Sequence, residues 1–138
     1  MPKLPRGVLE LAVSQAKKSV MLHKHGAVIW KSGTILGAGY NQPKQPPTQP
    51  VKRRYSIHGE RDALAGLRAD QIHGSSMLAV RVRSNGTLSF GSPCRGCTKL
   101  LSRKGVSTVY WFDELGNLNA TYLRSYKHEL HSHSLCQH

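Results

Sequence analysis

Acidic residues are scarce in this chain of 138 residues. Seven Asp and Glu oppose twenty Lys and Arg, which gives a formal net charge of +13 at pH 7. A surplus of this size in a small chain indicates a polyanion or a strongly charged substrate as the partner. The alternative is a basic surface that is simply solvated by water.

Cysteine is also rare, with three residues, and no apolar run approaches the roughly 20 residues of a membrane span. An odd number of cysteines argues against a disulfide framework and favours a reducing compartment. Polar and charged residues interrupt the N-terminal segment, so it lacks the apolar core of a secretory signal. We therefore expect a chain without a membrane segment that lies in the cytoplasm, or in the nucleus of a eukaryote.

The length suits one domain with its own core. We place this domain at 1–125, followed by a helix end and a histidine-rich tail at 126–138. Apolar residues at helical spacing predict an amphipathic helix over 5–19, and two strands, 26–30 and 34–40, are expected to form a hairpin. Residues 42–55 are rich in proline and basic side chains, which predicts an extended loop.

The second half of the chain alternates between helical and extended patterns. We expect a helix from about 58 to 67, a strand over 77–83 that turns back into 87–90, a helix to about 104 and a strand over 106–112. A final helix is predicted over Leu118–Leu130. Strands alternating with helices indicate a three-layer α/β domain.

The strongest chemical signal is a histidine combined with two closely spaced cysteines. His58 lies in Ser-Ile-His-Gly-Glu-Arg, and Cys94 and Cys97 lie in Ser-Pro-Cys-Arg-Gly-Cys. These three side chains are one short of the four ligands in a closed structural zinc site, whereas catalytic zinc keeps its fourth position for water. Glu60, two residues after the histidine, is well placed to take a proton from that water. The pattern therefore predicts a zinc hydrolase.

The spacing of the cysteines has a physical reason. Pro93 suits the first position of a helix, where its missing N–H costs nothing. Cys94 and Cys97, three residues apart in the first turn, then share one face. A helix N-terminus stabilises negative charge, which favours the thiolates that bind metal. With His58 at the start of another helix, two helix starts would meet at one site.

The two motifs resemble the His-x-Glu and Pro-Cys-x-x-Cys signature of zinc nucleobase deaminases, and the chain resembles the cytidine/deoxycytidylate deaminase superfamily. The similarity runs from about residue 9 to residue 112 and includes His25–Trp30 and Thr34–Asn41, which look like the opening hairpin of that superfamily. It implies a three-layer α/β/α cytidine-deaminase-like fold with a central mixed five-stranded sheet and the zinc-bearing helices on one face. It also implies one Zn²⁺ per chain on the histidine and cysteines named above.

The resemblance further implies contacts with a substrate. Asn41 ends the second strand, where the superfamily places an asparagine that contacts substrate; the alternative is an ordinary turn asparagine. Gly59 replaces the more usual alanine and is expected to shape the floor of the pocket. Ser92 and His25 are the remaining candidates for the pocket wall.

The residues after Cys97 and after Asn41 indicate which base reacts and whether it belongs to a free nucleotide or to a polynucleotide. Hydrolysis would occur at C4 of cytosine, or at C6 if the base were adenine. The Thr98–Leu101 continuation looks more like deoxycytidylate deaminases than tRNA adenosine deaminases, which favours cytosine. Deoxycytidylate deaminases usually follow their asparagine with Gly-Phe-Pro-Arg-Gly, whereas Asn41 is followed by Gln-Pro-Lys-Gln, which counts against a free nucleotide.

Adjacent cations beside an aromatic ring suit a phosphate backbone and a stacked base. The expected nucleic-acid-binding rim consists of Lys52, Arg53, Arg54 and Tyr55. We therefore favour deamination of cytosine to uracil in single-stranded nucleic acid, with DNA preferred.

Several alternatives stay open. The chain could deaminate free dCMP or CMP, or convert tRNA adenosine to inosine, or be a basic zinc module that binds nucleic acid without chemistry. The Cys-x-x-Cys could also be a redox pair. A structural zinc site would need a fourth ligand, for which the candidates are His23, His25, His131 and His133. The sequence predicts no particular oligomeric state.

Overall fold

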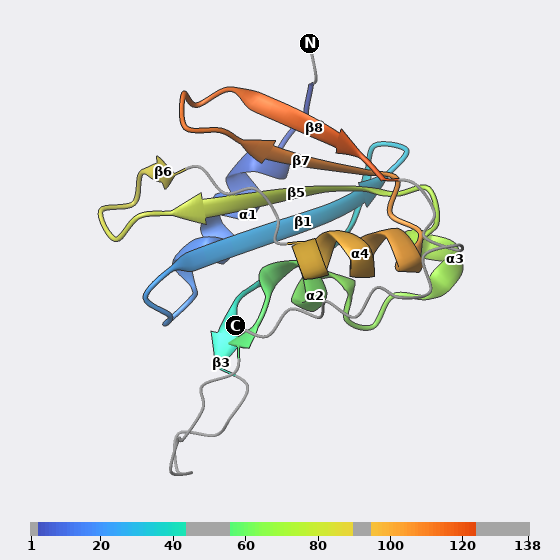
Figure 1. Ribbon diagram of the computed structural model, residues 1–138, viewed down its shortest axis with the longest axis horizontal. Helices are drawn as coiled ribbons and strands as arrows, with labels where there is room; N and C mark the ends of the chain where they lie inside the picture. Colours follow the sequence, from blue (N-terminus) through green and yellow to red (C-terminus); the bar gives the residue numbers. More distant parts are fainter. Residues whose placement is uncertain (1–2, 44–55, 90–94, 124–138) are drawn as a thin grey trace.

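A computed structural model describes residues 3–43, 56–89 and 95–123 (Figure 1). The main sheet comprises β1 (Lys24–Lys31), β2 (Thr34–Tyr40), β5 (Ser76–Val82), β6 (Leu88–Ser89), β7 (Thr108–Phe112) and β8 (Leu118–Tyr122). The strand order is β2-β1-β5-β7-β8, and β6 pairs with β5 as a sixth strand. β5 and β7 are parallel and the other neighbouring pairs are antiparallel. The expected mixed sheet of five strands is therefore present, with β6 added to it.

The helices form a layer on each face of this sheet (Figure 1). The described helices are α1 (Val8–Lys17), α2 (Gly59–Leu64), α3 (Ala69–Ile72) and α4 (Arg95–Lys104). α1 packs on one face of the sheet, while α2 and α4 pack on the other. The predicted three-layer α/β/α architecture is thus confirmed. None of the helices in the described residues is long and apolar enough to cross a membrane.

The inner strand β1, which lies between β2 and β5, explains how the core is divided. Ala27 and Ile29 face the layer that contains α2 and α4, whereas Val28 and Trp30 face α1. Successive side chains of a strand point to opposite faces, so a strand covered on both faces is apolar throughout. The ring of Trp30 stacks on that of Tyr110, with 5.6 Å between the centroids. The predicted hairpin of β1 and β2 is confirmed in this position.

Glycines in this hairpin let both helical layers approach the sheet closely. A Cβ at Gly26 would lie 2.2 Å from the carbonyl oxygen of Ala12 in α1. A Cβ at Gly39 would lie 2.5 Å from the backbone nitrogen of Ala63 in α2. Since real Cβ atoms do not approach backbone atoms so closely, the backbones of α1 and α2 rest on positions that only glycine can occupy.

A second, two-stranded sheet pairs β3 (Gln42–Pro43) with β4 (Ser56–Ile57). Its register sets Pro43 opposite Ser56, so the chain leaves and re-enters the described structure at adjacent points. The predicted extended loop lies between these points, and residues 44–55, including the expected basic rim, lie outside the described residues.

Two expectations about helices need correction. α2 ends at Leu64 rather than near residue 67, because Gly66 adopts a positive φ of 80° that terminates the helical path. The final helix predicted over Leu118–Leu130 is wrong where the structure describes it, since 118–122 form β8. The carboxylate of Asp113 accepts hydrogen bonds from the backbone N–H groups of Leu115 and Asn117, each at 2.9 Å, and so closes a hairpin. The remaining residues of that predicted helix, and the boundary at 125, lie outside the described residues.

Candidate metal centre

His58 lies at the start of α2, where the chain changes from extended to helical. Its backbone is extended, with φ −68° and ψ 150°, and it is the N-cap residue of the helix. The backbone N–H of Asp62 donates to the carbonyl of His58 at 3.0 Å, which closes the first turn. β4 directly precedes this residue, so a strand and a helix together determine the position of the imidazole.

Asp62 connects α2 to the end of the hairpin. One of its carboxylate oxygens accepts a hydrogen bond from the backbone N–H of Tyr40 at 3.1 Å and another from the side-chain amide of Gln42 at 3.0 Å. Together with the close contact at Gly39, these bonds hold α2 against β2. The sequence reasoning did not single out Asp62, because an acidic residue in a first helical turn is common for dipole reasons alone.

The structure brings His58, Glu60 and Cys97 into one group. Their ligand atoms all lie within 4.8 Å of one another. Nδ1 of His58 lies 3.0 Å from Sγ of Cys97, which is fully buried in α4. One nitrogen, one sulfur and one carboxylate at this separation suit zinc, which accepts all three types of ligand. Cys94 lies outside the described residues.

Zinc binds the thiolate of cysteine, so the form of the site that holds metal is the reduced one. The candidate fourth ligands His23 and His25 are not members of the group formed by the described residues.

Glu60 is a buried carboxyl group, 7% exposed. Burial raises the pKa of Glu60 above its ordinary value, and a hydrogen bond to the backbone opposes this only in part. A raised pKa favours the protonated form, so the carboxyl can hold a proton that a water molecule has released. Its position next to His58 and Cys97 makes it the group of this site that can transfer a proton.

His25 lies at the beginning of β1, beside the first residue of α2. A Cβ at the buried Gly59 would lie 3.4 Å from the carbonyl oxygen of His25, which is ordinary contact. The pKa of His25 is lowered to about 4, mainly by burial and to a smaller extent by the nearby basic groups Arg81, His58 and His23. The imidazole of His25 is therefore neutral near pH 7 and borders the metal centre.

The side chain of Asn41 bonds to the backbone at the start of β1 and just before it. Its oxygen accepts from the N–H of His25 at 2.9 Å, and its amide nitrogen donates to the carbonyl of His23 at 2.6 Å. Asn41 is buried, and these two bonds fix the segment that carries both histidines. Its predicted contact with substrate stays a prediction, as does that of Ser92, which lies outside the described residues together with Lys52–Tyr55.

Arg81 is a second residue near the site that the sequence reasoning missed. It interrupts the apolar strand β5 and is the register partner of His25. The signal was present in the sequence, because a lone arginine within Met-Leu-Ala-Val-Arg-Val breaks an otherwise apolar run.

Comparison with known proteins gives one family and several structural neighbours. Residues 4–113 match the family described as "Cytidine and deoxycytidylate deaminase zinc-binding region". No curated protein sequence matches the chain significantly.

Among solved structures, a cytidine deaminase from Burkholderia pseudomallei is similar with a TM-score of 0.59 at 17% identity, covering 87% of this chain and 93% of that chain. A dCMP deaminase from the cyanophage S-TIM5 has a TM-score of 0.52 at 24% identity, covering 80% and 86%. A cytidine deaminase from Mycobacterium tuberculosis has a TM-score of 0.51 at 14% identity, covering 93% and 95%. At these identities the likeness shows a shared fold.

Proposed function

Because the chain belongs to the cytidine and deoxycytidylate deaminase zinc-binding family, we propose that it converts cytosine to uracil by zinc-dependent hydrolysis in single-stranded nucleic acid, with DNA preferred over RNA. The observation that carries the reaction class is the buried carboxyl of Glu60, whose oxygen lies within 4.8 Å of the ligand atoms of His58 and Cys97. A carboxyl group in this position suits proton transfer at a metal centre.

His58, Cys97 and the sequence-predicted Cys94 would hold the metal. Bound zinc supplies Lewis acidity that lowers the pKa of a water molecule. Glu60 would take a proton from water, deliver it to the ring nitrogen of cytosine and later help to protonate the leaving amino group. Water and cytosine are thus converted to uracil and ammonia, with no net change in protons on Glu60.

The raised pKa of Glu60 supports this role. At pH 7, an exposed carboxyl group with its usual pKa would quickly release a bound proton to solvent. Burial raises the pKa of Glu60, so this carboxyl releases a bound proton less readily between the two transfers. The close contact between His58 and Cys97 supports the ligand set, because two ligands from different helices must meet for one metal ion to bind both.

Three features support a polynucleotide as the carrier of the base. The net charge of +13 favours a polyanion. The β3–β4 pairing anchors both ends of residues 44–55 next to His58, and that segment contains the cations Lys52–Arg54. Duplex DNA would hide the reacting atom within the base stack, so a single strand is the accessible form.

Free dCMP or CMP is the second candidate substrate. The same surplus of positive charge would hold one phosphate monoester, and the family includes enzymes of deoxycytidylate. Adenosine in tRNA is a weaker candidate, because the continuation after Cys97 looks more like deoxycytidylate deaminases.

The test is incubation of purified, reduced, zinc-loaded protein with dCMP, CMP and single-stranded DNA and RNA oligonucleotides, followed by mass spectrometry of the products. We expect Glu60→Gln to lower the rate of deamination by at least about 100-fold, since general acid–base catalysis contributes that much, while the zinc content stays at one per chain. Glu114→Gln removes an exposed carboxyl from a turn and serves as the matched control.

Full activity in Glu60→Gln would exclude the proposed mechanism. Absence of deamination of every substrate by the wild-type protein, with zinc bound, would instead favour the non-catalytic zinc module.

A further inference from the structure

Three basic side chains gather where β1 begins and β5 ends. They are His23, His25 and Arg81, which we name the His23–His25–Arg81 cluster. His25 and Arg81 are directly opposite in the antiparallel register of β1 and β5, so their side chains lie on the same face of the sheet. The guanidinium of Arg81 donates a hydrogen bond to Nδ1 of His23. The cluster therefore joins the sheet to the segment before it.

This cluster borders the metal centre. Ala27 and Ile29, which follow His25 at alternate positions of β1, pack in the same core as α2. His25 therefore lies on the sheet face that α2 covers. The first residue of α2, Gly59, lies against the backbone of His25. A group bound by the cluster would consequently lie next to a base held at the metal centre.

In the part of the chain that the structure describes, the charged and titratable neighbours of His25 in this cluster are basic. Besides burial, the groups of the described chain that lower the pKa of His25 are Arg81, His58 and His23, and all three are basic. Among residues 3–43, 56–89 and 95–123, Arg81 forms no ion pair with a carboxylate. Within the described residues, the guanidinium of Arg81 thus lies beside two imidazoles and forms no ion pair that would neutralise it.

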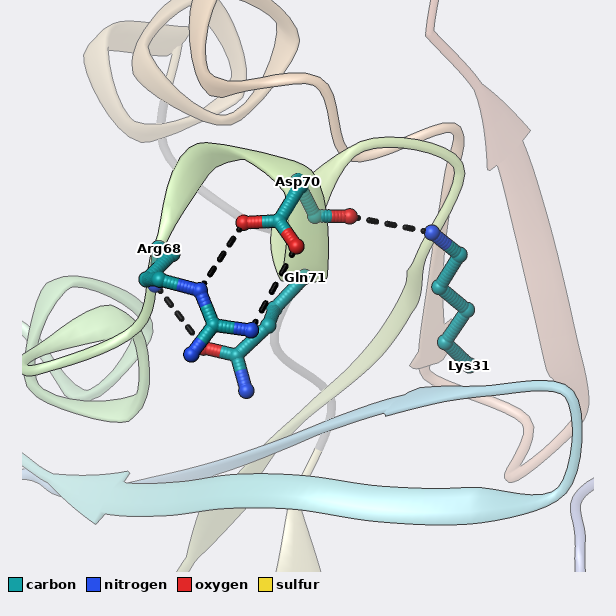
Figure 2. Close-up of polar contacts among 4 residues, drawn as sticks. All are labelled: Lys31, Arg68, Asp70 and Gln71. Atoms are coloured by element: carbon teal, nitrogen blue, oxygen red, sulfur yellow. Dashed lines mark hydrogen bonds and ion pairs between the residues drawn. The ribbon is translucent and has the colours of Figure 1, made fainter.

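Arg68 shows the contrasting case (Figure 2). Its Nε lies 3.0 Å from a carboxylate oxygen of Asp70, so the positive charge of Arg68 is paired with a neighbouring negative charge. The backbone carbonyl of Asp70 also accepts a hydrogen bond from the ammonium of Lys31 at 3.1 Å, and the side-chain oxygen of Gln71 accepts one from the N–H of Arg68 at 2.9 Å. Arg68 is therefore a suitable control for an arginine with a satisfied charge.

The backbone that carries the cluster is held in place. Asn41 bonds to both His23 and His25, and the hydroxyl of Ser19 donates to the carbonyl of Asn41 at 3.0 Å. A preorganised binding site loses less free energy on ordering when its ligand arrives.

We propose that the His23–His25–Arg81 cluster is a subsite for a phosphate group of the substrate, beside the metal centre. The guanidinium of Arg81 supplies the forked pair of donors that matches a phosphate, and its bond to His23 orients that fork. The neutral imidazole of His25 contributes a hydrogen bond without adding charge. This inference rests on the proposed function for the identity of the ligand, whose phosphate is either the monoester of dCMP or a phosphodiester of a single strand.

The test compares equilibrium binding of three ligands to the zinc-loaded full chain: deoxycytidine, dCMP and a single-stranded oligonucleotide that contains one deoxycytidine. We expect Arg81→Ala to weaken binding of a phosphate-bearing ligand at least about tenfold more than binding of deoxycytidine, since one hydrogen bond between charged groups is lost. Arg81→Lys, which keeps the charge but not the fork, should show a smaller loss and replaces Arg81→Ala if that variant does not fold. Arg68→Ala should bind all three ligands as the wild type does.

Two patterns of loss support the subsite and identify its ligand. A loss for dCMP and the oligonucleotide alike assigns the phosphate of the reacting nucleotide, whereas a loss for the oligonucleotide alone assigns a neighbouring phosphodiester. Equal losses for all three ligands, or no loss for either phosphate-bearing ligand, would overturn the proposal. Binding is measured without turnover, so the preference for phosphate-bearing ligands can be determined even if the protein deaminates none of them. That lack of deamination would refute the proposed function but not the phosphate subsite.

Discussion

At the scale of single residues, the surroundings of a side chain decide its chemistry. His58 lies against Sγ of Cys97, whereas His25 lies beside the basic groups Arg81 and His23. Local spacing could predict His58, Glu60 and Cys97 as a group, because two short motifs contain all three. The same spacing could not predict the bonds of Asn41 to the backbone at the start of β1 and just before it, which depend on contacts between distant segments.

The lowered pKa of His25 gives a prediction about pH. Because the folded-state pKa of about 4 lies below the ordinary value of 6.5, the contribution of His25 to the free energy of unfolding is present above pH 6.5 and is lost as the pH falls toward about 4. In the variant His25→Gln, we expect the free energy of unfolding to fall by about 2 kcal/mol less than in the wild type over this pH range, after allowance for solvent screening. Urea unfolding at a series of pH values measures it.

The metal ligands titrate in the same way in the variant and the wild type, so their contribution cancels in the difference between the two pH profiles. His73→Gln, at the C-cap of α3, controls for the loss of one histidine. Parallel pH profiles for His25→Gln and wild type would show that His25 is protonated as easily in the folded chain as in the unfolded one.

At the scale of elements, the metal centre depends on how closely α2 approaches the hairpin. Ala63 of α2 rests on Gly39, and Asp62 binds the backbone of Tyr40. His58 and Glu60 are at the start of the same helix, so any shift of α2 moves both relative to Cys97 in α4.

Two glycine substitutions form a matched pair that tests this dependence. Gly39→Ala would place a Cβ 2.5 Å from the backbone of α2, so we expect it to cost about 1–3 kcal/mol of stability and to weaken zinc binding. Gly59→Ala meets its nearest atom at 3.4 Å, so we expect unchanged or slightly higher stability and unchanged zinc binding. Thermal unfolding and zinc titration under reducing conditions measure both effects. Equal behaviour of the two variants would contradict the close packing at Gly39.

The predicted elements agree with the structure wherever periodicity is long and strong. The apolar spacing in α1 and the continuous apolar run of β1 sufficed to predict both elements. β8 was missed because its five residues carry no clear period, and its pairing depends on the turn at Asp113 and on a bond between the indole of Trp111 and the hydroxyl of Thr121 at 3.0 Å. β8 is a strand because it pairs with β7. The sequence of residues 118–122 alone does not contain the information about this pairing.

At the scale of the whole molecule, the net charge of +13 is the main feature that bears on the binding of nucleic acid. We expect replacement of Lys52, Arg53 and Arg54 with alanine to weaken binding of single-stranded DNA. Each phosphate contact that is lost should reduce the salt slope of the logarithm of the binding constant by about 0.7, and hence the triple variant by up to about 2. Fluorescence anisotropy of a labelled oligonucleotide across a salt series measures the slope.

The control removes the same charge elsewhere, with Arg68, Arg103 and Lys104 changed to alanine together. These exposed cations lie at the N-cap of α3 and at the end of α4 rather than in the segment before His58. A similar slope change in both triple variants would assign binding to overall charge instead of to a localised rim.

The pairing of Pro43 with Ser56 brings the two ends of residues 44–55 together. Since the twelve intervening residues, 44–55, begin and end at neighbouring points, their length and composition can vary without displacing His58. Under the proposed function, in which this segment binds the substrate strand, ligand preference would evolve independently of the hydrolytic chemistry at His58. Segments exchanged between related enzymes at these two positions should transfer selectivity while the reaction itself is retained.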